Sequence, residues 1–360
     1  MKHFLSYIAG RNPPGTVLSG ENRPRWISAE MQLHSHRKAY MENFNIDDYI
    51  DDRITIYSTD DPDFGHIEVC EGYYLGDHMR FLLVDDAMQS ACFTDEDIET
   101  SLPFDYMESF NWVYRINKHI KKTLLIGGGG FTYPRYYLDM YPDRYIDTIE
   151  ISPTIVDISR KYFGLTELEE KYGEHLKVIV EDGNKYLIDL ALRIKASASN
   201  TSSEPPAYET TSDYHSQESP ASEAESNSLS PGFPASDDSG DTPVSTDTAN
   251  RQGSSLNYSA QPLNDLKYDL ILNDAYVGHK SSDLLKKSAA LIKSCLREDG
   301  IYAANLVIPL KGNGAVQPKK DMEIFSEVFN YTFLFQCDDE INPYVPQNCI
   351  FFASDAPLDM

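Results

Sequence analysis

The sequence of 360 residues is poor in basic side chains: it has 31 lysines and arginines against 57 acids, which gives a formal net charge of −26. Proteins that bind nucleic acid need a basic surface against the phosphate backbone, so this composition argues against nucleic acid as a partner. An acidic surface suits a small cationic substrate such as an amine, although acidity most often serves only solubility.

The sequence also lacks cysteine motifs and long hydrophobic runs. Its five cysteines are scattered and form neither a CxxC pair nor a metal-ligand spacing, so we expect no metal and reduced thiols in a cytoplasmic protein. No uninterrupted apolar stretch approaches the roughly 20 residues that a membrane-spanning helix needs. The apolar run within residues 1–10 is too short for a signal peptide. We therefore expect a soluble, cytoplasmic protein with no membrane partner.

Residues 196–262 differ sharply from the rest of the chain, because they are mainly Ser, Thr, Pro, Asp and Glu with almost no aliphatic side chains. Such a segment buries too little apolar surface to offset its ordering entropy, so we expect a disordered insertion. It is either a tolerated surface insertion or a regulatory or partner-binding segment. The entropic cost of closing a loop grows slowly with its length, so the fold tolerates either.

Apolar runs alternate with helix-like segments in the second part of the chain. We expect strands near residues 123–127, 145–150, 176–180, 268–273, 300–306, 331–337 and 348–353, and helices from about 132 and at 153–163, 184–195, 281–296 and 320–329. This alternation predicts an α/β fold: a doubly wound, mostly parallel, seven-stranded sheet of the Rossmann-like methyltransferase type. Only a loop separates the last two strands, so these should pair antiparallel.

Short apolar runs separated by turn residues between positions 50 and 95 predict a small antiparallel sheet. We therefore expect a small β-hairpin domain over residues 51–110 and a Rossmann-like domain over residues 115–360, interrupted by the insertion at 196–262. Residues 1–50 have weak periodicity and no structural interpretation.

The apolar run from Thr123 to Ile126 ends in four glycines, Gly127 to Gly130, and a helix-like segment follows. Glycines at a strand-to-helix turn let the backbone approach a nucleotide closely. The acid that ends the next strand, Glu150, can accept hydrogen bonds from both ribose hydroxyls. This pattern predicts a nucleotide-like cofactor at Gly127, Gly128, Gly129 and Glu150.

Two further acids are expected at the same edge of the sheet, because ligands in such folds bind at the carboxyl ends of the strands. Asp182, which Gly183 follows, suits the exocyclic amine of an adenine, and Asp274 suits deprotonation of an attacking amine. Each has an alternative role as the N-cap of the next helix. These acids leave little room for the second half of a dinucleotide, which favours a single nucleoside with a short reactive arm, such as S-adenosylmethionine.

Several segments together resemble the spermidine synthase family of polyamine aminopropyltransferases, which has the class I methyltransferase fold. The similarity extends from about residue 66 to 354, excluding the insertion. Its segments are Arg80 to Ser90, Leu125 to Gly129, Ile149 to Ile151, Glu181 to Gly183, Tyr268 to Asp274 and Gly300 to Asn305. The combination is specific for the family, whereas each piece alone is not.

The resemblance implies a role for each matching residue. Gln89 would contact the methionine-derived part of the cofactor, Glu150 the ribose, and Asp182 the adenine, with Asp274 as the general base. The implied reaction transfers an aminopropyl group from decarboxylated S-adenosylmethionine to an amine. Members of the family often form homodimers through the N-terminal sheet, so a homodimer is also implied.

The chain departs from the family pattern at three places. Gly130 stands where the family has an aspartate that holds the amino end of the aminopropyl arm. The family's Y-H-E-M or Y-Q-E-M is replaced by Phe104 to Met107, which includes Asp105, and its D-S-S-D is replaced by Asp274 to Val277. The second carboxylate that grips the diamine is therefore absent.

These departures leave several functions open. The first is an aminopropyltransferase with a polyamine acceptor. The second is a methyltransferase that uses S-adenosylmethionine, which the loss of the aspartate at Gly130 favours. The third is a non-catalytic nucleoside-binding relative, and a nicotinamide oxidoreductase is the least favoured.

Overall fold

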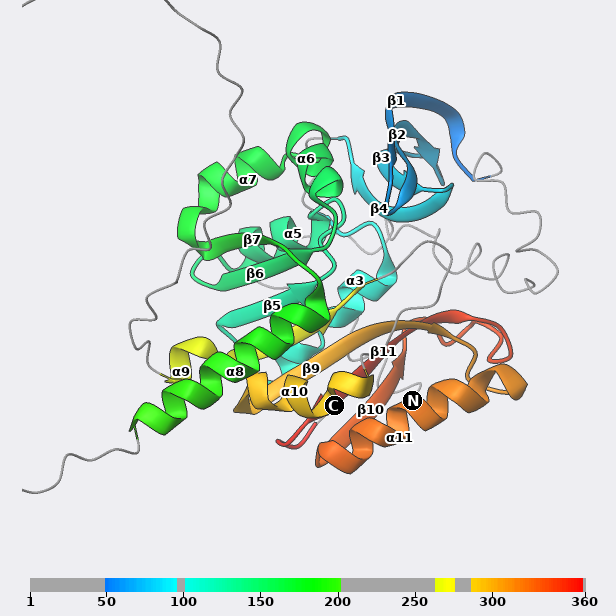
Figure 1. Cartoon of the computed structure of the whole chain (residues 1–360). Helices are drawn as coiled ribbons and strands as arrows, with labels where there is room; N and C mark the ends of the chain where they lie inside the picture. Colours follow the sequence, from blue (N-terminus) through cyan, green and yellow to red (C-terminus); the bar gives the residue numbers. More distant parts are fainter. Residues whose placement is uncertain (1–48, 96–100, 202–262, 276–285, 359–360) are drawn as a thin grey trace, which may run out of the picture.

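The computed structural model describes residues 49–95, 101–201, 263–275 and 286–358 (Figure 1). Most of residues 1–50, most of the expected insertion, and Tyr276 and Val277 lie outside them. The described chain forms a small sheet and a larger one.

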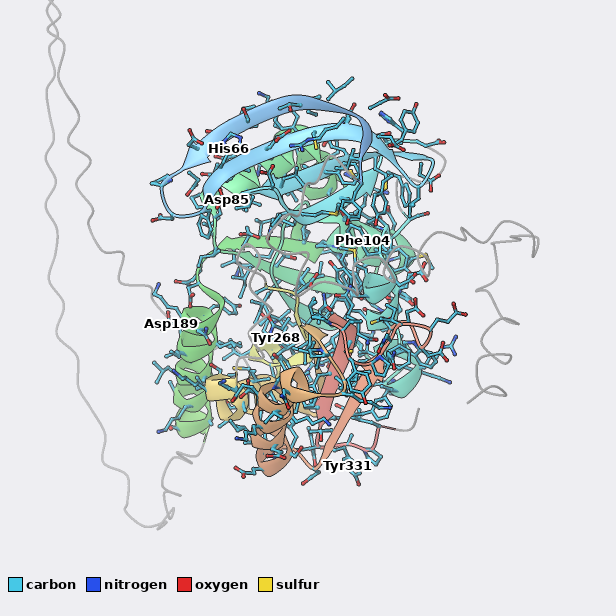
Figure 2. All side chains as sticks on the ribbon, turned by 90° about the vertical axis from the view of Figure 1, so that its right-hand side faces the viewer. His66, Asp85, Phe104, Asp189, Tyr268 and Tyr331 are labelled. Carbon is cyan, nitrogen blue, oxygen red and sulfur yellow. The ribbon has the colours of Figure 1, made fainter. Side chains whose placement is uncertain are left out.

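The small sheet is antiparallel and has four strands in sequential order. Its strands are β1 (Asp51–Asp61), β2 (Gly65–Tyr74), β3 (Asp77–Val84) and β4 (Ala87–Phe93). Asp85 and Asp86 join β3 to β4, both with positive φ, which matches the twist of a two-residue hairpin turn. Figure 2 shows Asp85 beside His66, whose backbone N–H donates to the Asp85 carboxylate at 2.9 Å. The small antiparallel sheet expected between residues 50 and 95 is therefore confirmed.

The larger sheet has seven strands in the order β10-β11-β9-β8-β5-β6-β7. They are β5 (Lys122–Ile126), β6 (Tyr145–Glu150), β7 (Leu176–Val180), β8 (Tyr268–Asn273), β9 (Leu296–Ile308), β10 (Tyr331–Gln336) and β11 (Gln347–Ser354). All neighbouring pairs are parallel except those that β11 makes with β9 and β10. This order, with one reversed strand second from the edge, is that of the class I methyltransferase fold, as the sequence predicts.

Helices cover both faces of the larger sheet (Figure 1). They are α3 (Asp105–Phe110), α4 (Val113–Ile116), α5 (Thr132–Met140), α6 (Pro153–Tyr162), α7 (Leu165–Tyr172), α8 (Gly183–Thr201), α9 (Leu263–Leu266), α10 (Ala289–Cys295) and α11 (Val316–Val328), with short 3-10 turns at Gly173–His175, Lys286–Ser288 and Asn313–Ala315. One core cluster joins the sheet to α8, α10 and α11, and the other joins it to α3, α5 and α7. Because helices bury both faces, every residue of β8 is buried, which explains its continuous apolar character.

Helix α6 connects the two sheets. Ser152 caps its first turn by accepting from the Ile155 N–H at 3.1 Å, and Pro153 follows as its first residue. Ile155 and Ile158 of α6 pack against Ile67 and other apolar side chains of the small sheet. The small sheet is thereby held next to the carboxyl edge of the larger one.

Several expected helix boundaries were wrong. The helix expected over 153–163 ends at Tyr162, and Gly164, with φ of +67°, separates it from α7, which the sequence analysis missed. Helix α8 continues to Thr201, so the disordered insertion expected from residue 196 does not begin there. The alanines at 196 and 198 are strong helix formers and explain the extension. The rest of the insertion lies outside the described residues.

Two properties of the described residues concern membranes and metals. None of the helices in these residues is both long and apolar enough to cross a bilayer. Over the same part of the chain, no group of three or more His, Cys, Asp and Glu side chains is arranged to hold a metal ion.

Candidate active site

The glycine turn after β5 lies directly against the end of β8. Gly127 has φ of +98°, and a Cβ atom there would lie 2.5 Å from the backbone oxygen of Asp274. The Asp274 N–H in turn donates to the Ile126 oxygen at 2.8 Å. Only glycine meets both conditions at position 127, so this residue brings the turn and Asp274 together.

Glu150, at the end of β6, is hydrogen-bonded to this turn. Its Oε2 accepts from the N–H groups of Gly128 at 3.0 Å and Gly129 at 2.9 Å, and its Oε1 accepts from Ser152 N–H at 3.0 Å. The residue is only 6% exposed. A carboxylate oxygen accepts up to two hydrogen bonds, so Oε1 keeps the capacity to take a ribose hydroxyl while the side chain fixes the turn.

The end of β7 carries the predicted adenine-binding residues. Asp182 Oδ1 accepts from the Lys185 N–H at 2.8 Å, so this exposed carboxylate caps α8, which is the alternative role expected from the sequence. At Gly183 a Cβ atom would lie 2.6 Å from the Ile126 side chain, so the start of α8 is packed tightly on β5. Contact of either residue with adenine stays a prediction.

Two apolar side chains beside Glu150 were missed by the sequence analysis. Ile151 is 47% exposed and Val180 is 49% exposed, and Val180 pairs with Glu150 across β6 and β7. Exposed aliphatic groups at this edge can pack against the flat faces of a base. An apolar residue directly after a strand-ending acid is the signal that could have identified Ile151.

The β3–β4 hairpin reaches the other side of the glycine turn. A Cβ atom at Gly129 would lie 3.6 Å from the Gln89 backbone oxygen and 3.3 Å from the Ser90 Cβ. Thr132, at the start of α5, also donates its hydroxyl to the Ala91 oxygen at 2.8 Å. The Gln89 amide itself folds back and donates to the Ala87 oxygen at 3.2 Å. Gln89 is thus next to the turn, and its contact with a cofactor stays a prediction.

The space beside the fourth glycine is already filled. A Cβ atom at Gly130 would lie 2.9 Å from both Phe163 Cδ1 and Ser90 Oγ. Phe163 is buried, and the carbonyl oxygens of Tyr162 and Phe163 accept hydrogen bonds from Arg80 and Arg135. These contacts fix the end of α6, so the aromatic ring forms a packed wall beneath Gly130.

The backbone after this wall has an unusual conformation. Phe131 has φ of +56°, the left-handed region, although it is not glycine, and its side chain is buried in the core. Such a conformation costs of order 1–3 kcal/mol and persists only where the surroundings enforce it. Strain of this kind clusters at functional turns, which agrees with a binding role for this one.

Asp274 follows β8 and is held from two sides. Its Oδ1 accepts from Asn305 Nδ2 at 3.0 Å and its Oδ2 accepts from the Tyr106 hydroxyl at 3.1 Å. Burial raises the pKa of Asp274 to about 7, and the two hydrogen bonds act in the opposite direction. A carboxyl group with a pKa near 7 is suited to general base catalysis at neutral pH.

Asp105, which belongs to the segment that departs from the family pattern, lies one residue before Tyr106 on α3. Burial, together with the charges of Glu108 and Asp338, raises the pKa of Asp105 to about 7. The sequence analysis missed the contacts that Tyr106 and Asn305 make with Asp274. No local pattern identifies them, because these residues are far from Asp274 in the chain.

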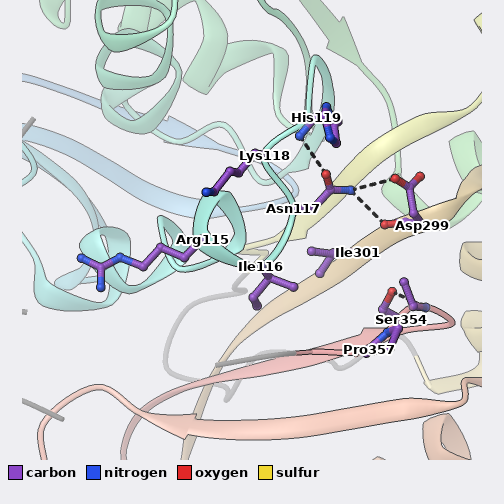
Figure 3. A pocket seen from close by; sticks show the side chains of 10 residues that line it. Arg115, Ile116, Asn117, Lys118, His119, Asp299, Ile301, Ser354 and Pro357 are labelled. Atoms are coloured by element: carbon purple, nitrogen blue, oxygen red, sulfur yellow. Dashed lines mark hydrogen bonds between the residues drawn. The ribbon is translucent and has the colours of Figure 1, made fainter.

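A separate cavity of about 320 Å³ lies at the opposite edge of the sheet (Figure 3). Its lining includes Asp299 near the start of β9 and Ser354 at the end of the reversed strand β11. In its wall the Asn117 amide donates to Asp299, and its oxygen accepts from the His119 N–H at 2.8 Å. Since parallel strands present their carboxyl ends at the other edge, this cavity is distinct from the candidate site.

The curated relatives of the chain are methyltransferases. No family model matches the chain. A segment of 68 residues is 32% identical to the eEF1A lysine and N-terminal methyltransferase of Mus musculus and 31% identical to the Homo sapiens protein. This segment covers 19% of the chain and 9% of each curated relative, so the chain matches only a small part of their length.

Solved structures with similar folds include spermidine synthases and a methyltransferase-like protein. A spermidine synthase in complex with the transition-state analogue AdoDATO is 15% identical, with a TM-score of 0.48, over 85% of this chain and 73% of that one. A probable spermidine synthase from Corynebacterium glutamicum is 16% identical, with a TM-score of 0.49, over 85% of this chain and 81% of that one. Human methyltransferase-like protein 13 in complex with SAH is 16% identical, with a TM-score of 0.42, over 71% of this chain and 84% of that one.

Proposed function

We propose that the protein is an S-adenosylmethionine-dependent methyltransferase that acts on an amine. The observation that carries the proposal is the contact between the glycine turn and the end of β8. The backbone oxygen of Asp274 lies 2.5 Å from where a Gly127 Cβ would be. A nucleoside donor bound at the turn therefore has its reactive end close to a carboxyl group with a pKa of about 7.

The surroundings of Gly130 support methyl transfer over aminopropyl transfer. No acid stands at this position, and Phe163 and Ser90 occupy the adjacent space. The ammonium group of a decarboxylated donor would lack a counter-charge there, and burying an unpaired charge is costly. S-adenosylmethionine brings its own carboxylate beside its ammonium, so its arm needs no acid at residue 130.

The residues at the carboxyl edge suit an adenosyl group. We assign the ribose hydroxyls to Glu150, the exocyclic amine of adenine to Asp182, and the faces of the base to Ile151 and Val180. The first turn of α8 at Gly183 would lie against the base. The β3–β4 hairpin, with Gln89, would lie along the methionine-derived arm, because it contacts the glycine turn.

The chemistry requires one proton acceptor. When bound, S-adenosylmethionine supplies a methyl group that the amine nitrogen takes while the sulfur keeps the electron pair of the broken C–S bond. An amine is protonated at neutral pH, so Asp274 must first accept a proton from the ammonium to free the nitrogen lone pair. Because burial raises the pKa of Asp274 to about 7, its carboxylate is a stronger base for this step than an ordinary, exposed carboxylate.

The acceptor is a primary amine in this proposal. The curated relatives are named for methylation of the eEF1A lysine and N-terminus. A lysine side chain or an N-terminal amine is therefore the first class to test, followed by a small polyamine. The acidic composition of the chain suits either cation.

Aminopropyl transfer from decarboxylated S-adenosylmethionine is the second candidate. The position of Gln89 beside the glycine turn favours it, since this hairpin carries the spermidine-synthase motif. Asp274 would act in that reaction as the same general base.

Donor titration separates these functions. Calorimetry on the full-length protein with S-adenosylmethionine, its decarboxylated form and methylthioadenosine should show the tightest binding for S-adenosylmethionine. Labelled methyl transfer to lysine peptides and diamines should then be detectable. A preference for the decarboxylated donor would support aminopropyl transfer. Binding without turnover of either donor would contradict both and indicate a non-catalytic nucleoside-binding protein.

A further inference from the structure

The carboxyl group of Asp274 accepts hydrogen bonds from side chains of two separate elements. Asn305, on β9, is 1% exposed and donates to Oδ1 at 3.0 Å, so this oxygen is turned toward the protein interior. Tyr106, on α3, donates its hydroxyl to Oδ2 at 3.1 Å. The rotation of the carboxyl group is therefore fixed at both oxygens.

The ring of Tyr106 is itself held in place by two aromatic neighbours. It stacks on Phe104, with centroids 5.9 Å apart and planes inclined by 11°, and it meets Phe110 edge-on at 6.1 Å and 82°. Phe110 is fully buried. Little side-chain entropy is then lost when the hydroxyl stays on Asp274, which is typical of a preorganised contact.

The contact leaves Oδ2 able to react. A carboxylate oxygen accepts up to two hydrogen bonds, so Oδ2 can receive the Tyr106 hydroxyl and an acceptor N–H at the same time. Oδ1 faces the buried Asn305, whereas Oδ2 faces the half-buried Tyr106. The geometry thus singles out one oxygen for the proton.

We propose that Tyr106 is a positioning residue, which acts with Asn305 to direct Oδ2 of Asp274 toward the acceptor amine. This inference rests on the proposed function and adds to it the oxygen that takes the proton and the residue that aims it. Tyr106 does not exchange a proton with the substrate. Its hydroxyl stabilises the ionised form of Asp274 and fixes its orientation.

The groups that face Asp274 in the described residues are few. From α3 it meets the Tyr106 hydroxyl, from β9 the uncharged Asn305, and from the glycine turn the backbone of Gly127. The nearest acid along α3 is Asp105, whose pKa is raised by burial and by the charges of Glu108 and Asp338. Removal of the Tyr106 hydroxyl should therefore change the pKa of Asp274 without interference from a charged side chain in contact with it.

The test is Tyr106→Phe in the full-length protein, which keeps the ring and removes only the hydroxyl. Losing one hydrogen bond to the carboxylate should raise the pKa of Asp274 by roughly 0.5 to 1 unit. We would follow the carboxyl carbon of Asp274 by ¹³C NMR titration, with Asp274→Asn for assignment. The acid limb of the pH–rate profile should move to higher pH by the same amount, and kcat should fall while KM for the donor stays constant.

Tyr136→Phe is the matched control. Its hydroxyl accepts from the Asn111 amide at 3.0 Å in the same aromatic region and does not contact Asp274. It should leave both the titration and the pH–rate profile unchanged. An effect equal to that of Tyr106→Phe would overturn the proposal, because it would show a general response of the aromatic packing.

The two readouts separate this inference from the proposed function. If the NMR pKa of Asp274 shifts as expected but no acceptor is methylated, the positioning role stands and the methyltransferase function is wrong. If methyl transfer occurs and Tyr106→Phe leaves the NMR pKa, the pH profile and kcat unchanged, the function stands and the positioning role is wrong.

Discussion

The two halves of the candidate site are built in different ways. The donor half consists of the glycine turn and Glu150, whose carboxylate accepts from backbone N–H groups 22 and 21 residues earlier in the chain. In the acceptor half, Asp274 depends on Tyr106, 168 residues away, and on Asn305. The donor half follows from one strand–turn–helix–strand unit, whereas the acceptor half exists only when α3, β8 and β9 have packed together.

This difference separates the expected effects of mutation. Changes in the donor half should affect nucleoside binding and the stability of the turn. Changes in the acceptor half should affect transfer with little effect on donor affinity.

Asp274→Asn tests the acceptor half most directly. Asparagine keeps the shape but cannot take a proton, so kcat should fall by about 10²- to 10⁴-fold. Calorimetry should show S-adenosylmethionine affinity close to that of the wild type, because the donor contacts lie on other strands. Unchanged transfer would exclude Asp274 as the general base, and a parallel loss of donor affinity would remove the distinction between the halves.

Glu150→Ala tests the donor half. It leaves the N–H groups of Gly128, Gly129 and Ser152 without their acceptor, and each unsatisfied buried donor costs about 1–3 kcal/mol. We expect a lower free energy of unfolding in urea and weaker nucleoside binding. Glu169→Ala, which removes a surface ion pair with Arg160, should cost only about 0–1 kcal/mol. Wild-type nucleoside affinity in Glu150→Ala would show that the donor site lies elsewhere.

Gly130→Ala tests the wall beneath the fourth glycine. The added methyl group would lie 2.9 Å from Phe163 and Ser90, and overpacking of this kind costs about 1–3 kcal/mol. Phe163→Leu should relieve part of that cost. The loss of unfolding free energy in the double variant, measured in urea, should therefore be smaller than the sum of the losses in the two single variants. Strict additivity would mean that the contact with Phe163 is not the source of the strain.

Asp105, which lies beside the acceptor half, should affect the pH dependence of stability. Burial raises the pKa of Asp105 to about 7, above its value in the unfolded chain, so the folded state binds the extra proton. The stability that this proton uptake by Asp105 adds to the folded state is therefore lost as the pH rises from about 4 to about 7. Asp105→Asn should flatten this part of the curve, measured by urea unfolding at closely spaced pH values. An unchanged slope would show that Asp105 is not protonated preferentially in the folded state.

The sequence predicted the features that depend on local patterns. Buried strands such as β8 are continuous apolar runs, and the glycine turn is recognisable because backbone geometry restricts its residue types. Both sheets and the reversed strand β11 were therefore predicted. The hydrogen bonds that Glu150 accepts from the glycine turn could not be predicted, since they depend on side-chain geometry.

The contacts between residues far apart in the chain could not be predicted from the sequence. Tyr106 lies in a segment that shows only a departure from the family pattern, and its contact with Asp274 arises from the packing of α3. The wall at Gly130 depends on Phe163, whose position follows from contacts of the α6 end with Arg80 and Arg135. The division between α6 and α7 at Gly164 was missed because an isolated glycine is also tolerated within helices.

The length of α8 has a practical consequence for handling the protein. This 19-residue helix starts at the carboxyl edge of the sheet and, at 1.5 Å per residue, carries the chain about 28 Å away from it. The described chain resumes at α9, just before the amino end of β8. The end of α8 and the start of α9 therefore lie away from the carboxyl edge that carries the candidate site, so a fluorophore or affinity handle attached at either helix end starts outside that site.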